Sequence, residues 1–239
     1  MRTMQLVIGN KNYSSWSMRP WVLMRGLGLP FEERKLSFLL GLGSGFREAM
    51  RPISPAARVP VLIDGDTTVW DSLAIAEYLH ERFPDRGVWP QTLAARTRAR
   101  SVCAEMHSGF AALRQHCPMN VEASLPAIGA RVLREQPAVQ RDLARIDELW
   151  SEALADTAKN PASSGGGPFL FGAFGAADAY FAPVALRVRT YRLPLSAAAA
   201  AYGERLLAAP GPADWIADAL QEHEYVPEDE PYRPAPAKA

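Results

Sequence analysis

The stretch that decides the fold is Arg58-Val59-Pro60-Val61-Leu62, followed closely by Val69-Trp70-Asp71-Ser72. An X-Pro bond is the common place for a cis peptide, and a proline at the start of a strand gives up no hydrogen bond of the sheet. A cis bond before Pro60 would turn the backbone N–H and C=O of Val59 outward, where they can pair with an extended ligand. This stretch therefore predicts a peptide-binding edge.

The second stretch predicts the start of a helix, because an apolar pattern of helical spacing follows Asp71 and Ser72. Ser72 is the expected N-cap. A helix N-terminus attracts a carboxylate, and Asp71 beside it can hold an ammonium group, so one end of a zwitterionic ligand would fit here. The alternative is an ordinary hairpin over residues 59–63 and 67–70, followed by a capped helix without a ligand.

The N-terminal segment adds a strand, a loop and a helix in front of this region. Residues 6–9 are a short apolar strand, residues 10–15 a polar turn, and residues 18–27 have helical spacing with Pro20 in the expected first turn. A further strand is predicted over residues 31–36. The predicted order is β-α-β, an irregular helical stretch, then β-β-α.

At these residues the chain resembles a known family. Residues 4–84 are similar to the thioredoxin-like N-terminal domain of the glutathione S-transferase superfamily, and the serine motif resembles that of zeta-type and related bacterial members. The resemblance continues through the second half of the chain. The segments that carry it are Ser14-Ser15-Trp16-Ser17-Met18-Arg19-Pro20, Ser54-Pro55-Ala56-Ala57-Arg58-Val59-Pro60-Val61-Leu62, Trp70-Asp71-Ser72-Leu73-Ala74-Ile75, Leu170-Phe171-Gly172 and Ala177-Asp178-Ala179.

The expected architecture is therefore an α/β thioredoxin-like domain over residues 1–84 and an all-α domain over residues 92–239. In the second domain we expect one apolar helical stripe through Val102, Met106, Phe110 and Leu113 and a buried helix over residues 176–191. Further helices are predicted over 139–150, 196–207 and 212–221, a loop over 160–168, and a loosely held tail from residue 224. Gly175 replaces the usual Ser or Thr of a capping box with Asp178.

Composition and charge exclude several classes of function. The chain has 239 residues, 48% of them hydrophobic, and a formal net charge of +0. It therefore lacks the basic character of a nucleic-acid or anionic-membrane binder. No apolar run is long enough to span a membrane, and we expect a cytoplasmic protein. Cys103 and Cys117 are expected to be reduced, and they have no metal-ligand spacing with the histidines.

The chemistry that the resemblance implies is activation of the glutathione thiol. Lowering a thiol pKa of about 8.5 by about two units takes roughly 2.7 kcal/mol, which one charge-assisted hydrogen bond and a helix N-terminus can supply. A serine at the start of the first helix is the expected donor. Ser14 is the first candidate by alignment with the serine motif, and Ser15 is close behind it. Ser17 is expected to cap the helix.

The resemblance also assigns the rest of the glutathione site. Val59 would pair with the cysteinyl backbone, Pro60 would hold the cis bond, and Asp71 with Ser72 would bind the γ-glutamyl end. Arg58 would face the glycine carboxylate, or it is a solvated surface arginine. Arg47 and Arg51 are weaker candidates for the same role.

The electrophile would lie between residues 13–16 and the first helix of the second domain. Candidate substrate-binding residues are Tyr13, Trp16, Met106, His107 and Phe110. These side chains also suit plain packing between domains. Neither His107 nor His116 has a partner pattern that would make it a general base.

One departure from the family pattern bears on the reaction. Isomerases of the maleylacetoacetate kind have Cys where this chain has Trp16, which favours glutathione transfer over isomerisation. Reduction of a mixed disulfide is disfavoured, since no Cys occurs in the first 102 residues. A glutathione-dependent isomerase or dehalogenase and a non-catalytic binding module remain alternatives. By resemblance we also expect a homodimer, with glutathione as the co-substrate and no metal.

Overall fold

The structure, a computed structural model, describes residues 3–41, 45–159 and 166–234. Its N-terminal region is a mixed sheet with the strand order β2-β1-β3-β4. The strands are β1 (Met4–Ile8), β2 (Phe31–Lys35), β3 (Val61–Asp64) and β4 (Thr67–Trp70), with β1 parallel to β2 and antiparallel to β3. The inner strand β1 is almost wholly buried, whereas the edge strand β2 has the exposed sequence Glu32-Glu33-Arg34-Lys35, whose charges discourage edge-to-edge pairing.

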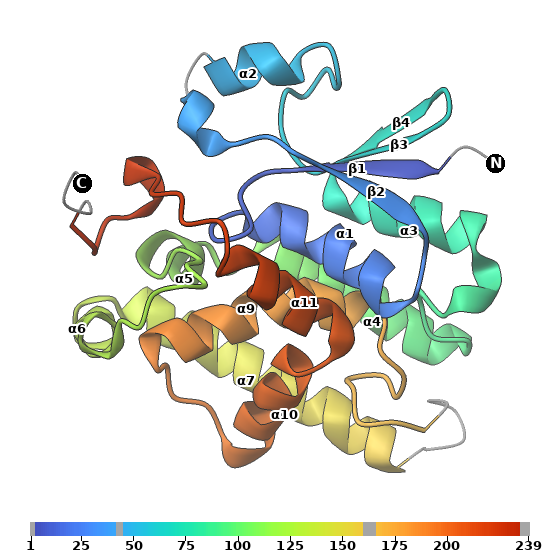
Figure 1. Ribbon diagram of the computed structural model, residues 1–239. Coiled ribbons are helices and arrows are strands. Elements are labelled where there is room, and N and C mark those ends of the chain that lie inside the picture. The colour runs from blue at the N-terminus through green and yellow to red at the C-terminus, as the bar shows by residue number, and fades with distance from the viewer. Residues whose placement is uncertain (1–2, 42–44, 160–165, 235–239) are drawn as a thin grey trace.

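Helices cover both faces of this sheet (Figure 1). The helices α1 (Ser15–Gly26) and α3 (Ser72–Arg82) lie on the face toward the helical region, and α2 (Gly45–Met50) lies on the other face. Under α2, Phe46 and Met50 pack against Val7 and Val61 of the sheet in a small core of their own. The thioredoxin-like class expected from the sequence is confirmed.

The second half of the described chain is helical. Its elements are α4 (Leu93–Ser108), α5 (Ala111–His116), α6 (Pro126–Glu135), α7 (Pro137–Lys159), α9 (Ala176–Tyr191), α10 (Ala197–Leu207) and α11 (Pro210–Ala219), with short 3-10 turns η1 (Phe38–Leu40), η2 (Pro84–Arg86) and η3 (Pro227–Asp229). Among the described helices, none combines the length and the apolar character that a membrane crossing requires.

Helix α1 is buried on nearly every side, because it lies between the sheet and helices α9 and α11. It begins at Ser15, earlier than expected, so Pro20 falls beyond the first turn. Since proline has no N–H, the carbonyl of Trp16 lacks its usual donor four residues on. One continuous apolar core runs from the sheet through α1 into α9 and α7, where Trp150 packs edge-on against Phe181.

Helix α9 has the predicted bounds, and Asp178 anchors its N-terminus. The carboxylate of Asp178 accepts hydrogen bonds from Gly175 N at 3.0 Å, from Leu170 N at 3.2 Å and from the hydroxyl of Tyr202 at 2.8 Å. The carboxylate half of the capping box is therefore present although Gly175 has no side chain to contribute.

The apolar stripe expected from Val102 to Leu113 is buried as expected, but it does not lie on one helix. The helix α4 ends at Ser108, Phe110 has a left-handed φ of 55°, and α5 begins at Ala111, so two helices share these residues. Most of the predicted loop over residues 160–168 lies outside the described residues.

Candidate functional site

The turn before α1 places a serine hydroxyl cluster at a helix N-terminus. The backbone N–H of Ser14 donates to Asn10 O at 2.8 Å, which closes the turn, and Ser14 is the N-cap residue of α1. The expected cap, Ser17, lies instead in the first turn of the helix and is fully buried, where its Oγ accepts from Gly9 N at 3.1 Å. The prediction that Ser17 caps the helix is therefore wrong. The helix begins earlier than expected, and its N-cap is Ser14, three residues before Ser17.

The two candidate catalytic serines have different hydrogen-bond partners. Ser14 Oγ donates to Ser17 Oγ at 2.7 Å, so its only proton is engaged inside the protein. Ser15 Oγ accepts a hydrogen bond of 3.3 Å from Nη2 of Arg187 in α9. No acceptor for the Ser15 proton occurs among the described residues, so this hydroxyl is available to a ligand.

The segment before β3 has the backbone form that a peptide-binding edge requires. The bond between Val59 and Pro60 is cis, and Pro60 is buried at the start of the β3–β4 hairpin. The hairpin expected as an alternative is thus also present, because β3 and β4 pair from Val61 with Trp70 to Asp64 with Thr67.

At the end of β4, Asp71 and not Ser72 is the N-cap of α3. Asp71 has φ 75° and ψ 135°, and its side chain accepts from Leu73 N at 2.9 Å. Ser72 is the first residue of the helix, and its buried Oγ makes no hydrogen bond of normal geometry in the described structure, although the hydroxyl of Tyr180 lies near it. An unpartnered buried hydroxyl at a helix N-terminus is a ready contact for a carboxylate.

A smaller cleft brings most of these groups together. Its volume is about 310 Å³. Its lining comprises Trp16, Ala56, Arg58, Val59, Pro60, Trp70, Asp71, Ser72 and His107. The five main candidates for glutathione binding, Arg58, Val59, Pro60, Asp71 and Ser72, therefore line one cavity, together with His107, which the sequence predicts at the electrophile.

A larger cleft of about 470 Å³ adjoins the smaller one and shares Trp16, Arg58 and Val59 with it. It contains the serine pair and the loop before it. Its lining comprises Tyr13, Ser14, Ser15, Trp16, Phe38, Phe46, Arg47, Ala57, Arg58, Val59, Arg114, Pro118, Met119, Arg187 and Asp229. Both serines thus line the larger cleft, next in sequence to Trp16, which lines both clefts.

The larger cleft is rich in positive charge. Arg47 and Arg58 have no ion pair with any described residue. Arg187 is buried, and its guanidinium contacts only neutral acceptors, namely Ser15 Oγ, Cys117 O at 2.9 Å and Pro183 O at 3.2 Å. Burial, with Arg19 and Arg114 nearby, lowers the pKa of Arg187 to about 10. The geometry suits anionic groups in this cleft.

The predicted electrophile residues separate into two sets. Tyr13 and Trp16 line the larger cleft, while Met106 is fully buried, Phe110 is 6% exposed, and neither lines one of these clefts. His107 packs edge-on against Trp16, with Nε2 3.4 Å from Asp71 Oδ2, and burial lowers its pKa. Arg51 also lies outside both linings.

Sequence reasoning missed Arg19, which lies beneath Trp16. Its guanidinium is 4.1 Å from the ring centre of Trp16 and 5.0 Å from that of Tyr180. Arg19 is almost fully buried, and its Nε and Nη1 have no partner in the part of the chain described. The sequence did contain a signal for a buried arginine, because Arg19 lies among the apolar residues of α1.

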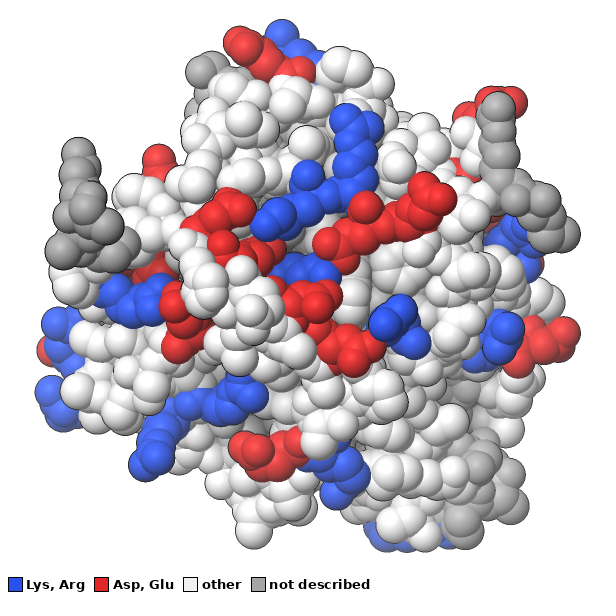
Figure 2. All heavy atoms as spheres, viewed as in Figure 1, with Lys and Arg blue, Asp and Glu red and all other residues white. Residues whose placement is uncertain are grey.

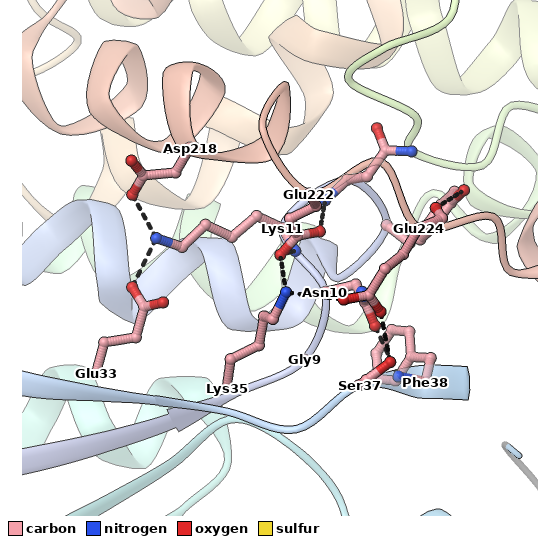
Figure 3. A network of polar contacts seen from close by, with 12 residues as sticks. Gly9, Asn10, Lys11, Glu33, Lys35, Ser37, Phe38, Asp218, Glu222 and Glu224 are labelled. Atoms are coloured by element: carbon pink, nitrogen blue, oxygen red, sulfur yellow. Dashed lines mark hydrogen bonds and ion pairs between the residues drawn. The ribbon is translucent and has the colours of Figure 1, made fainter. Parts of the chain in front are cut away.

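The C-terminal strap, residues 222–233, was also missed. The expectation of a loosely held tail is wrong up to residue 234, and residues 235–239 lie outside the described structure. Glu222 accepts from Lys11 N at 2.8 Å, and Glu224 accepts from Asn10 Nδ2 at 2.8 Å and from Ser37. Figure 3 shows these carboxylates pointing toward the loop that leads to the serines.

A band of alternating charge marks the same contact on the surface (Figure 2). Lys11 pairs with Glu33 of β2 at 2.6 Å and with Asp218 of α11, and Lys35 pairs with Glu222 at 3.3 Å. The strap and α11 therefore connect β2 and the serine loop to the helical region.

Comparisons with known proteins find one family that is similar to the N-terminal part of the chain. The family described as "Glutathione S-transferase, N-terminal domain" matches residues 10–87. Dichloromethane dehalogenase of Methylorubrum extorquens is 36% identical over 66 residues, 28% of this chain and 23% of that protein. Glutathione S-transferase theta-1 of Homo sapiens is 34% identical over 90 residues, 37% of this chain and 35% of that protein. The matches span less than half of either relative.

Solved structures extend the likeness of the fold to most of the chain. A glutathione transferase homologue from Burkholderia, solved with bound glutathione, superposes with a TM-score of 0.66 at 24% identity, covering 92% of this chain and 99% of that one. A glutathione transferase from Methylococcus capsulatus superposes with a TM-score of 0.62 at 22% identity, covering 91% and 98%.

Proposed function

Since this chain belongs to the glutathione S-transferase superfamily, we propose that it binds glutathione across the two adjoining clefts and activates its thiol for attack on an electrophilic small molecule. The observation that carries the proposal is the position of Ser15, which lines the larger cleft beside the shared residue Trp16 and whose hydroxyl proton has no acceptor in the described structure. Family and fold support glutathione as the co-substrate.

The γ-glutamyl end of glutathione belongs in the smaller cleft. Its carboxylate would accept from the unpartnered Ser72 hydroxyl and the backbone N–H groups at the start of α3, and its ammonium would approach the exposed carboxylate of Asp71. The cysteinyl backbone would pair with Val59 beside the cis bond. Arg58 and Arg47 would attract the glycine carboxylate from the larger cleft.

The sulfur would then meet the serine pair, with Ser15 as the main donor. Ser14 was the first candidate from the sequence, but its proton goes to Ser17. Arg187 withdraws electron density from Ser15 Oγ through its own hydrogen bond and so strengthens the Ser15 proton as a donor. One charge-assisted bond of about 1.5 to 3 kcal/mol, with about 0.3 to 1 from the helix N-terminus, accounts for a thiol pKa lowered by about two units.

An isomerase that acts on an acidic substrate is the second candidate. Arg114 and Arg187 face the larger cleft without a carboxylate partner among the described residues, which suits a substrate that bears a carboxylate. The indole of Trp16, in place of a cysteine, still favours transfer. A dehalogenase would use the same thiolate, whereas a non-catalytic binding module would need none.

Titration of bound glutathione separates these functions. Glutathione affinity is measured by calorimetry, and the thiol is followed by thiolate absorbance as the pH is raised. We expect the bound thiol to titrate about two pH units below the free thiol. Binding with an unshifted thiol pKa would leave only a binding module, and turnover of a maleyl-type diacid would favour the isomerase.

We also propose that the protein is a cytoplasmic homodimer, with the N-terminal domain of one chain on the helical domain of the other. Exposed apolar side chains at Trp70 and Leu93, which are 45% and 73% exposed, support such a contact. Sedimentation as a monomer at micromolar concentration would contradict it.

A further inference from the structure

The C-terminal strap contributes a carboxyl group to the larger cleft. Asp229, in the 3-10 turn η3, lines this cleft together with Ser14 and Ser15. Its Oδ2 is buried and has no hydrogen-bond partner in the described part of the chain. A buried carboxylate oxygen without a donor is costly, so its presence in a ligand-sized cleft calls for an explanation.

Tyr13, the residue before the serine pair, fixes the position of this turn. The single proton of the Tyr13 hydroxyl is shared between Glu230 Oε1 at 2.7 Å and Glu224 O at 3.0 Å, with the shorter contact to Glu230. Within the turn, Asp229 N donates to Val226 O at 3.0 Å. Hydrogen bonds from Tyr13 therefore attach the strap to the serine loop, and Asp229 is adjacent to the anchored Glu230.

Other titratable groups of this cleft are unsuited to accept a proton near neutral pH. The arginines remain protonated. Tyr13 donates its proton to Glu230, and burial raises its pKa. Glu230, which follows Asp229 but does not line the cleft, is engaged by Arg233 and Tyr13.

The Asp229 carboxylate, unlike these groups, has no side-chain hydrogen bond or ion pair with a described residue. Burial, followed by the charges of Glu228 and Glu230, raises its pKa to about 6. Arg47, Arg58, Arg114 and Arg187 also line the cleft, and none of them forms an ion pair with Asp229 in the described residues. At neutral pH Asp229 is thus mostly an unpaired carboxylate.

We propose that Asp229 is the proton acceptor for the thiol of glutathione bound in this cleft. The inference rests on the proposed function and extends it. The thiol S–H bond breaks, its proton passes to Asp229 directly or through one water molecule, and the electron pair stays on sulfur. A thiol whose pKa is lowered to about 6.5 by the serine is closely matched to such an acceptor, so the transfer is near balance. The proton then leaves to solvent.

The test follows thiolate absorbance after rapid mixing with glutathione, between about pH 5 and 8 and at low buffer concentration. For the unaltered protein we expect the rate of thiolate formation to fall below about pH 6 as Asp229 becomes protonated. Asp229→Asn is expected to slow thiolate formation about 10²-fold at neutral pH and to leave only the pH dependence of the thiol's own titration, with glutathione affinity unchanged. Formate is expected to restore part of the rate in Asp229→Ala, which a purely structural role would not allow.

The matched control is Glu228→Gln, an adjacent carboxylate that does not line the cleft. We expect it to keep the rate at neutral pH and to move the acid limb to lower pH, because one charge that raises the pKa of Asp229 is gone. An Asp229→Asn protein with the rate and pH profile of the unaltered protein would overturn the inference. Absence of a thiolate signal in the unaltered protein would instead overturn the proposed function.

Discussion

Nη2 of Arg187 donates a hydrogen bond of 3.3 Å to Oγ of Ser15, from a helix that begins far along the chain. The guanidinium has no carboxylate partner in the described structure, so part of its charge acts on the serine. The contact lets the helical region tune a hydroxyl of the thioredoxin-like region. Ser15, more than Ser14, is therefore the group whose removal should affect the thiol.

The first prediction compares the two serines. Ser15→Ala removes the available proton and should raise the pKa of the bound glutathione thiol by about one to two units, equivalent to about 1.5 to 3 kcal/mol. Ser14→Ala should raise it less, because the Ser14 proton is engaged with Ser17. The measurement is the thiolate titration, with the exposed Ser101→Ala as control. A larger shift in Ser14→Ala would reverse the assignment.

The second prediction concerns Arg187 itself. Arg187→Met keeps much of the side-chain volume and removes the charge, so the thiol pKa should rise by about one unit while glutathione still binds. Stability should change little, because relief from burying an uncompensated charge offsets the loss of two carbonyl partners. Arg189→Met, an exposed change on the same helix, is the control. An unshifted thiol pKa in Arg187→Met would show that Ser15 acts alone.

The third prediction concerns the glycine end of glutathione. Arg58 and Arg47 are exposed at the cleft, so each should contribute about 0.5 to 1 kcal/mol, and Arg58→Ala or Arg47→Ala should weaken glutathione binding about two- to fivefold. The loss should shrink as salt is added. Arg51→Ala, outside the cleft, should bind normally. Calorimetry with glutathione and with its glycine amide checks the contact, since the amide should show no difference between the variants.

How far the sequence could lead is clearest at Pro60 and Asp71. Their neighbourhoods carry strong local signals, namely an X-Pro pair at a strand start and an acidic residue before an apolar helix pattern, so the cleft they form was predictable. The residues at which the helices begin were less predictable. The structure gives the N-cap positions expected for Ser17 and Ser72 to earlier residues, because α1 begins before Ser17 and because Asp71 takes the cap hydrogen bond at α3.

Long-range contacts account for what the sequence did not reveal. Asp229 and Glu230 belong to a polar, proline-rich segment whose composition is typical of a loose tail. Their order comes from Tyr13, more than two hundred residues away, and no local pattern predicts such a bond. Arg187 likewise lies in a strongly apolar helix, and its orientation depends on Ser15 and the carbonyl of Cys117.

The fourth prediction concerns the anchor of α9. In Asp178→Asn an NH₂ group replaces one of the two carboxylate oxygens. This NH₂ group then faces the backbone N–H of either Gly175 or Leu170, and that N–H loses its acceptor. The free energy of unfolding should fall by about 2 to 3 kcal/mol. Asp147→Asn, where the carboxylate caps Ser196 at the exposed start of α10, should cost about 1 kcal/mol or less. Denaturant unfolding measures both variants, and equal losses would argue against the buried anchor.

The fifth prediction tests the attachment of the strap. Tyr13→Phe removes the hydroxyl that bonds to Glu230 and to the carbonyl of Glu224, so the strap should loosen by about 1 to 3 kcal/mol. Hydrogen exchange at Val226, Asp229 and Glu230 should accelerate accordingly. Tyr78→Phe removes a comparable bond to Asp64, far from the strap, and should leave these amides unchanged.

Acidification below about pH 4.3 should loosen the strap in the same way, whereas protonation of Asp229, whose pKa burial raises to about 6, should stabilise it at higher pH. Burial raises the pKa of Glu230, but hydrogen bonds from Arg233 and Tyr13 lower it by more, so the folded pKa lies below the ordinary value. A depressed carboxyl pKa stabilises the folded form above the unfolded pKa of about 4.3, and the stabilisation is lost as the pH falls through the folded pKa. In Tyr13→Phe one of the lowering bonds is gone, so strap exchange should accelerate at a higher pH than in the unaltered protein. Identical pH profiles in the two proteins would mean that Tyr13 does not hold the strap through Glu230.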